Sequence, residues 1–275
     1  MGKASNAAFH NRRFAALRNR LAFIITTFLL LGFMIQMPAL ADEASAKATL
    51  RAMSDYLAGQ RSFSAKFNTE LEVITPAIEK ITFSSTGNIV LNRPDKLRAD
   101  RTGGYADVEL VYDGKAFILH GKHKNSYIQI EIPGTVDNLI DQLREKYGAA
   151  LPFADLLLSS PYDALMDGVL EAKDIGRGVI DGVECEHLAF RNNDVDWQLW
   201  VQLGANPIPR QYIITSKTLA GAPQYRIRIS DWKTDVPSAS DAFAFKAPDG
   251  AKPATIDAMK DFDELPAPAE PQKGK

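Results

Sequence analysis

Cysteines, histidines and clustered basic residues are scarce in this 275-residue sequence. It contains one cysteine and four histidines, so it has no internal disulfide framework. Beyond residue 41 the chain carries 27 Lys and Arg against 34 Asp and Glu, a net charge of −7. An acidic balance without a basic run argues against nucleic-acid binding. Glycine, proline and charged residues occur at ordinary frequencies, which excludes a collagen-like or wholly disordered chain.

Known catalytic motifs are also missing. The sequence has no Gly-x-Ser-x-Gly, His-Glu-x-x-His, phosphate-loop or dinucleotide fingerprint. Cys185 and His187 lie two apart on an expected strand and could supply two metal ligands, but zinc sites need three or four, so we interpret them as strand residues. Asp194 and Asp196 adjoin an Asn-Asn pair, where a turn explains carboxylates. We predict a protein that is not an enzyme and has neither metal nor cofactor.

The amino terminus is typical of an export signal. Residues 1–20 are basic, residues 21–35 are almost entirely apolar, and Ala39-Leu40-Ala41 has the small-x-small pattern that signal peptidase cleaves. The alternative is an uncleaved membrane anchor. Asp42 follows, not a lipid-attachment cysteine. We predict a signal peptide at 1–41, cleavage after Ala41 and a periplasmic mature protein.

Period-two alternation of apolar residues dominates the mature chain and predicts about eleven antiparallel strands. Asp113-Gly114 lies between two of these runs and is a strong hairpin signal. The alternating runs span residues 62–73, 81–91, 97–101, 108–112, 115–120, 127–132, 170–175, 183–191, 195–203, 209–217, 224–234 and 243–246. On residues 224–234 the alternation places Trp232 on the same face as Arg226 and Arg228.

Four helices are expected among these strands. Residues 43–58 repeat apolar side chains at helical spacing, and Thr135 caps a helix with an apolar stripe that Gly148 ends. Short helices with proline in the first turn are expected at 152–158 and 161–166. The prediction is one α+β domain at 42–262, followed by a disordered tail at 263–275 that is rich in proline and charge.

So many antiparallel strands are expected to curl into an unclosed half-barrel, with helices covering its concave face. Pattern alone favours an ordinary packed core there over a cavity. If a cavity forms, the apolar face of the first two strands and the helices should line it. The residues predicted to line it are Phe63, Phe67, Leu71, Ile81, Phe83, Ile89 and Leu91 on the strands and Leu139, Leu143, Leu156 and Leu157 on the helices.

Three motifs in order along the chain resemble the LolA/LolB-like superfamily of periplasmic lipoprotein carriers. They are Gly87 to Arg98 with its Arg93-Pro94 step, the turn Asp113-Gly114-Lys115, and Phe243 to Gly250. The middle of the chain, with Asp181 to Phe190 and Asp196-Trp197, resembles instead an exported bacterial family of unknown function. The chain is identified as a member of that family within the LolA-like fold.

The resemblance implies an open barrel whose helices plug an apolar cavity, and a carrier of lipid or of lipoprotein acyl chains. It implies that Arg93 gates the release of cargo; the alternative is a simple turn cation before Pro94. The expected partners are a lipid or acylated protein and an envelope protein, with the carrier itself a monomer. Because a LolA-like domain also occurs in periplasmic stress regulators, a sensor or regulatory protein is the alternative function.

Overall fold

The computed structural model describes residues 39–104, 107–237 and 241–256. The chain divides into two units, Met1–Ala41 and Asp42–Lys275, and the description below concerns the second. Almost all of the predicted signal peptide and the whole predicted tail at 263–275 lie outside the described residues, so both stay predictions. Within those residues, no helix has the length and apolar character needed to cross a membrane.

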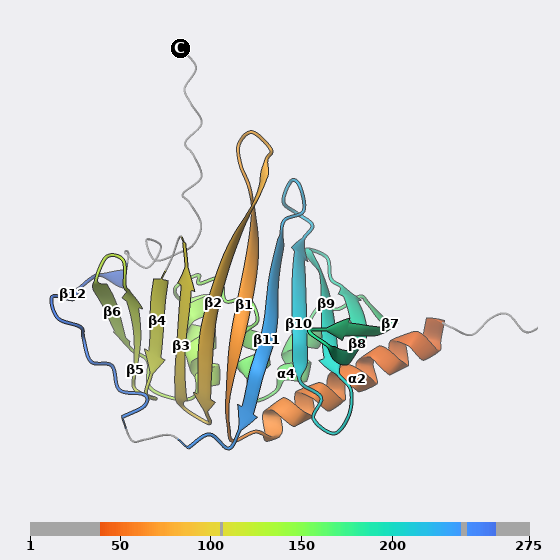
Figure 1. Cartoon of the computed structure of the whole chain (residues 1–275), viewed down its shortest axis with the longest axis horizontal. Coiled ribbons are helices and arrows are strands. Elements are labelled where there is room, and N and C mark those ends of the chain that lie inside the picture. Colours follow the sequence, from red (N-terminus) through yellow and green to blue (C-terminus); the bar gives the residue numbers. More distant parts are fainter. Residues whose placement is uncertain (1–38, 105–106, 238–240, 257–275) are drawn as a thin grey trace, which may run out of the picture. The chain divides into compact units, whose positions relative to one another are not determined.

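One sheet contains all twelve strands of the described chain (Figure 1). Its spatial order is β12-β6-β5-β4-β3-β2-β1-β11-β10-β9-β8-β7. The strands are β1 (Ser62–Ile74), β2 (Lys80–Asn92), β3 (Lys96–Gly103), β4 (Asp107–Tyr112), β5 (Ala116–Gly121), β6 (Ser126–Glu131), β7 (Glu171–Ile180), β8 (Val183–Arg191), β9 (Val195–Gln202), β10 (Pro209–Ser216), β11 (Gln224–Thr234) and β12 (Lys252–Pro253). Every neighbouring pair is antiparallel except β12 with β6. Because β12 and β7 end the order without pairing, the predicted unclosed antiparallel sheet is confirmed.

Two meanders make up this sheet. Strands β1 to β6 pair in chain order, as do β7 to β11, and the two sets join where β1 pairs with β11. Side chains of odd-numbered residues on β1 and β2 share the concave face because strand residues alternate between faces. The predicted Asp113-Gly114 turn joins β4 to β5, and Gly114 has the positive φ of 85° that this turn requires.

Two helices cover the concave face, one over each meander. Helix α2 (Ala39–Gly59) buries Leu50, Met53 and Leu57 against β8 to β11. Helix α3 (Val136–Glu145) buries Leu139 and Leu143 against β1 to β5. The helix predicted at 43–58 is confirmed and begins four residues earlier. The space between the two packed regions is where a site can form.

Local signals set the ends of α3. The Thr135 hydroxyl accepts a hydrogen bond from the Asn138 N–H at 3.2 Å, the expected N-cap. At the other end Gly148 adopts φ 63° and its N–H donates to the Arg144 carbonyl at 3.1 Å, which closes the helix in the way that glycine favours.

Two predicted elements differ from the structure. Residues 152–158 contain only a 3₁₀ turn, η1 (Ala154–Leu157), because Phe153 has a left-handed φ of 70° that ends regular geometry; α4 (Pro161–Met166) is as predicted. The strand predicted at 243–246 is wrong. Its alternation arises because Phe243 is buried and the Phe245 ring packs 5.3 Å from the Tyr127 ring, and the chain pairs with β6 only later, at β12.

His187 lies on the convex face of the sheet, opposite Trp200 in the register of β8 and β9. Its ring stacks on Trp200 at 3.9 Å and its Nε2 lies 3.0 Å from the Gln198 amide oxygen. Burial lowers the pKa of His187 below its ordinary 6.5, and the Gln198 hydrogen bond and the Asp174 charge only partly oppose this. The folded state therefore binds this proton less tightly than the unfolded state.

We expect the His187 contribution to stability to be fully present above pH 6.5 and to be lost as the pH falls below that value. His187→Phe keeps an aromatic ring on Trp200 and removes the titration. Thermal unfolding measured between pH 7.5 and pH 5 should show a smaller loss of Tm for the variant than for the wild type. An equal loss of Tm in the wild type and in His187→Phe would contradict this prediction.

Candidate ligand cavity

A cavity of about 840 Å³ lies between the concave face of the sheet and the helices. Its size falls within the range of about 300–1,000 Å³ typical of ligand pockets. A packed core leaves few voids larger than a water molecule, so the ordinary core favoured by the sequence pattern alone does not describe this region.

One wall consists of side chains from β1 to β5. They alternate along each strand, as the period-two pattern predicted, and most are apolar. This wall contains Phe63, Ala65, Phe67, Thr69, Ile89, Leu97, Ala99, Arg101, Val108, Leu110, Phe117 and Leu119, together with Asp100, which departs from the alternation. The Phe67 ring lies directly over Gly87 of β2, where any side chain would collide with it. Glycine at 87 thus lets a large aromatic ring lie flat against the neighbouring strand.

Strand β11 completes the sheet wall with Tyr225, Ile227, Ile229 and Trp232. A register shift between Ser64 and Lys66 of β1 accompanies a positive φ of 49° at Asp231. This bulge changes the parity of the strand, because one extra residue moves the following side chain to the other face. Trp232 therefore turns into the cavity and stacks on Phe63 at 4.3 Å. The sequence prediction that placed Trp232 beside Arg226 and Arg228 is wrong for this reason.

The opposite wall comes from α3 and from the segment that follows it. Helix α3 contributes Leu139, Ile140 and Leu143, and residues 146–157 add a largely apolar stretch. Phe153 anchors this stretch, with its ring 4.9 Å from the Tyr212 ring and 5.0 Å from the Tyr225 ring. We call α3 and residues 146–158 the lid.

The structure brings together seven of the eleven residues that the sequence predicted as cavity lining. They are Phe63, Phe67, Ile89, Leu139, Leu143, Leu156 and Leu157. Leu91 is instead fully buried in the core beneath α3. Leu71, Ile81 and Phe83 share the concave face but lie nearer the tip of the β1–β2 hairpin and outside the cavity lining. The structure places them beyond the lid because the strands extend past it.

Arg93 connects the sheet to the lid. It follows the end of β2, and its guanidinium donates to the carbonyls of Leu157 at 2.8 Å and Leu158 at 3.0 Å. Burial lowers the pKa of Arg93, and the Asp137 carboxylate partly offsets this. Asp137, in the first turn of α3, accepts from the Ser159 N–H at 3.1 Å. Arg93 thus ties residues 157 and 158 of the lid to the end of β2, and Asp137 ties the first turn of α3 to Ser159, the residue that follows the lid.

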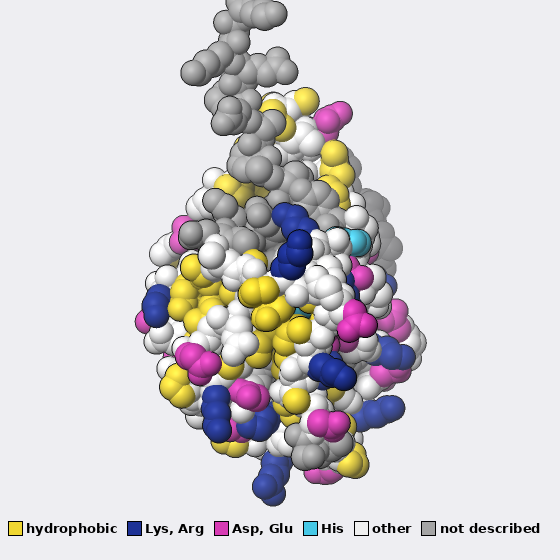
Figure 2. Space-filling model, turned by 90° about the vertical axis from the view of Figure 1, so that its left-hand side faces the viewer, with side chains coloured by type: hydrophobic (Ala, Val, Ile, Leu, Met, Phe, Trp, Pro, Cys, Tyr) yellow, Lys and Arg dark blue, Asp and Glu magenta, His cyan; other side chains and the backbone are white. Residues whose placement is uncertain are grey.

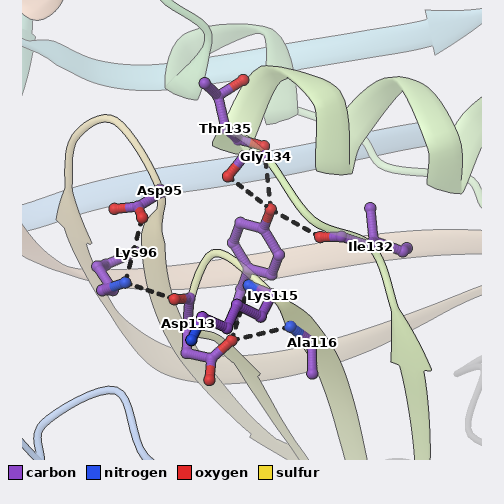
Figure 3. A network of polar contacts seen from close by, with 9 residues as sticks. Asp95, Lys96, Asp113, Lys115, Ala116, Ile132, Gly134 and Thr135 are labelled. Atoms are coloured by element: carbon purple, nitrogen blue, oxygen red, sulfur yellow. Dashed lines mark hydrogen bonds and ion pairs between the residues drawn. The ribbon is translucent and has the colours of Figure 1, made fainter.

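A second polar network fixes the near end of the lid (Figure 3). The buried Tyr112 hydroxyl lies 2.9 Å from the carbonyl oxygens of Ile132 and Gly134, which precede α3. Next to it, Asp113 accepts from the backbone N–H groups of Lys115 and Ala116, at 2.9 and 2.8 Å. Burial acts to raise the pKa of Asp113, but these donors outweigh it and the pKa lies below its ordinary value. The lid is therefore tethered at both ends.

Few polar groups face the cavity. The buried hydroxyls of Thr69 and Ser85 satisfy each other at 2.5 Å. The charged residues of the lining are Arg101, Lys146 and Asp100, whose carboxylate accepts from the Asn88 amide at 3.1 Å. Seen from the side of β6 and β12, the surface has hydrophobic side chains near its centre, with charges of both signs around them (Figure 2).

The residues weighed for metal chemistry have other surroundings. Cys185 is a free, buried thiol whose Sγ contacts the Val183 carbonyl, and burial raises its pKa. It shares the convex face with His187, away from the cavity. Within the described segments, no group of three or more His, Cys, Asp or Glu residues has a metal-binding arrangement.

The sheet, the lid and the apolar cavity define an open antiparallel half-barrel with a helix-covered pocket. The chain belongs to the family described as predicted periplasmic protein (DUF2092), which matches residues 46–257. This match confirms the exported family of unknown function that the middle segment of the sequence indicated. No curated protein matches the chain.

Solved structures with a similar fold share little sequence with this protein. An uncharacterised conserved protein from Thermus thermophilus has a TM-score of 0.47 at 10% identity, covering 77% of this chain and 99% of its own. The lipoprotein LppX of Mycobacterium tuberculosis has a TM-score of 0.46 at 14% identity, with coverages of 72% and 100%. A LolA superfamily protein from Nitrosomonas europaea has a TM-score of 0.36 at 10% identity, with coverages of 73% and 97%.

Proposed function

We propose that this protein is a non-catalytic periplasmic carrier that holds one acyl-chain ligand, a lipid or a lipoprotein acyl chain, in the cavity beneath its lid. The observation that carries the proposal is the 840 Å³ space with its predominantly apolar lining. Arg101 and Lys146 are suited to an anionic head group. The regulatory alternative stays a prediction from resemblance.

The energetics favour a bound but exchangeable ligand. Each buried methylene contributes about 0.8 kcal/mol, so a chain of a dozen carbons gains roughly 10 kcal/mol before other terms. Loss of translational freedom removes at least about 4 kcal/mol of this, which leaves an affinity between the millimolar and micromolar ranges. Such an affinity suits a carrier that must also release its cargo.

Arg93 is proposed as the gating residue, because its two hydrogen bonds end on lid carbonyls. Hydrogen bonds from a charged donor are stronger than neutral ones, and both ends of this contact move apart if the lid lifts. The Arg93 side chain therefore sets the free energy of lid opening, and Asp137 supports it from α3.

The purified protein is expected to contain lipid. Organic extraction followed by mass spectrometry should find an acyl-chain compound in amounts comparable to the protein, and the delipidated protein should take up a fluorescent fatty-acid probe. The carrier proposal fails if the native protein carries no lipid and the delipidated protein binds no probe.

Filling the cavity should abolish most of this binding. Ala99 of β3 faces the cavity, so Ala99→Phe places a ring in the ligand space while keeping the wall apolar. We expect probe affinity to fall at least tenfold with little change in Tm. Ala189→Phe is the matched control, since Ala189 lies on the convex face of β8 beside Gln198. An equal loss of probe affinity in both variants, or no loss of probe affinity in Ala99→Phe, would contradict the assignment of the site.

A further inference from the structure

Two hairpins project beyond the rest of the sheet at one end (Figure 1). They are the β1–β2 hairpin with its turn at 75–79 and the β10–β11 hairpin with its turn at 217–223. The two lie side by side, since Ile74 Cδ1 is only 2.9 Å from the position a Cβ on Gly221 would take. The Gln224 N–H also donates to Glu72 at 2.9 Å. We call the two turns the paired tips.

Ile78 at the first tip is both exposed and strained. Its side chain is 79% exposed and its φ is 64°. Its N–H donates to the Thr75 carbonyl at 2.8 Å, and the Thr75 N–H to the Glu79 carbonyl at 2.9 Å, a tight turn whose left-handed position normally holds glycine or asparagine. A β-branched residue there is a true outlier. Folding alone gives no reason for isoleucine at this position.

Other large apolar side chains accompany Ile78. Leu219 at the second tip is 58% exposed, and Ile81, just below the first, is 43% exposed. Two cations near the tips are paired within the protein, Lys80 with Glu72 at 2.9 Å and Lys217 with Asp196 at 3.0 Å. Glu79, inside the first turn, adds a carboxylate that accepts from the Thr75 hydroxyl at 3.2 Å. The paired tips therefore present exposed apolar side chains beside a single carboxylate, and no cluster of cations among their described residues.

The paired tips are continuous with the cavity along the concave side of the β1–β2 hairpin. Leu71 pairs with Phe83 and Val73 with Ile81, so four apolar side chains follow one another toward the turn. Leu71 is also opposite the cavity residue Tyr225. The convex side of the same hairpin is polar and carries the ion pair of Glu70 with Arg226 at 2.7 Å. We call Leu71, Val73, Ile81 and Phe83 the apolar strip.

We infer that the paired tips insert into the surface of a lipid bilayer and that the apolar strip guides an acyl chain between the bilayer and the cavity. This inference rests on the proposed carrier function and adds the place where cargo enters and leaves. A specific protein interface needs roughly 20–30 residues on each side, far more than two narrow turns provide. A fluid bilayer needs no complementary shape and accepts a few apolar side chains.

The test uses the double variant Ile78→Asn/Leu219→Asn and phosphatidylcholine vesicles. Asparagine suits the left-handed turn position, so we expect unchanged or higher Tm together with at least a tenfold loss of vesicle association in sedimentation. Transfer of a fluorescent lipid out of vesicles should slow in parallel. Uptake of a soluble fatty-acid probe should be unchanged, because the cavity is intact.

Two matched proteins separate this inference from the proposed function. Leu170→Asn/Val179→Asn removes side chains that are 61% and 64% exposed at β7, at the end of the strand order, and should bind vesicles like the wild type. Ala99→Phe should keep vesicle association and lose probe binding. If Ala99→Phe still binds the fatty-acid probe while the tip variant no longer associates with vesicles, the proposed carrier function fails and the inference of bilayer docking stands.

Three results would overturn bilayer docking. The first is vesicle association that is absent in the wild type or unchanged in the tip variant. The second is association that disappears in 0.5 M salt, because insertion of apolar side chains is insensitive to ionic screening. The third is a tip variant whose main change is in oligomeric state by light scattering, which would assign the tips to a second copy of the chain.

Discussion

Replacing Arg93 by alanine is expected to loosen the lid and to shorten the residence time of any ligand. The variant loses both hydrogen bonds from the guanidinium to the carbonyls of Leu157 and Leu158. Because the site is only partly buried, we expect a loss of about 2 kcal/mol rather than the sum of two fully buried charged hydrogen bonds. For a domain of this size that corresponds to roughly 4–8 °C in Tm.

The same loss should appear in the kinetics of exchange. If lid opening limits release, about 2 kcal/mol corresponds to more than a tenfold faster release of a fluorescent acyl probe, measured by stopped-flow displacement. Arg93→Lys is the informative control, since lysine keeps the charge but lacks the fork that bonds two acceptors. A lysine variant that releases probe as slowly as the wild type would show that charge alone, and not the two-carbonyl contact, holds the lid.

Gly87→Ala should be the most destabilising single methyl group added to the sheet. The new Cβ would overlap the Asp100 carbonyl oxygen and would lie 2.8 Å from Phe67 Cε2. Since the carbonyl belongs to the paired strand β3, relief requires β2 and β3 to separate. Overpacking of this kind costs about 3 kcal/mol at its upper range, or roughly 6–12 °C in Tm.

Gly87→Ala also reaches the cavity, because Phe67 must leave its place over residue 87. Probe affinity should therefore fall along with Tm. Gly59→Ala is the matched control: its Cβ would meet nothing within 4 Å, and alanine at the end of α2 should leave Tm nearly unchanged. A Gly87→Ala protein as stable as Gly59→Ala would mean that the β2–β3 pairing is not as close as described.

Alternation along the strands allowed the sequence to predict which face of each strand is apolar. It placed Phe63, Phe67 and Ile89 on the concave face correctly, since the strand period of two does not depend on distant contacts. The Thr135 cap and the Gly148 stop likewise predicted the helix whose Leu139 and Leu143 face the cavity. Local rules thus account for the apolar faces of β1 and β2 and for the helix of the lid.

Features set by distant contacts could not be predicted in this way. The bulge at Asp231 that turns Trp232 inward depends on how β11 meets β1, which are far apart in sequence. Phe67 lines the cavity and Phe83 does not, because the lid covers only part of the length of β1 and β2. Phe243 and Phe245 alternate because their side chains pack onto other strands. In a single sequence this packing gives the same period-two pattern as a strand that pairs in the sheet.

The position of β1 between β2 and β11 determines when the cavity forms during folding. Leu71 pairs with Tyr225 across 154 residues of chain, whereas every other antiparallel neighbour in the described sheet is also next in sequence. Contacts this distant form late in folding, because closing a long loop must precede them. The walls come from both meanders, with Phe63 and Phe67 on one and Ile227 and Trp232 on the other. The cavity therefore lacks one wall until the last long strand, β11, has paired with β1. If the proposed function holds, uptake of an acyl probe during refolding should follow the pairing of β11 with β1.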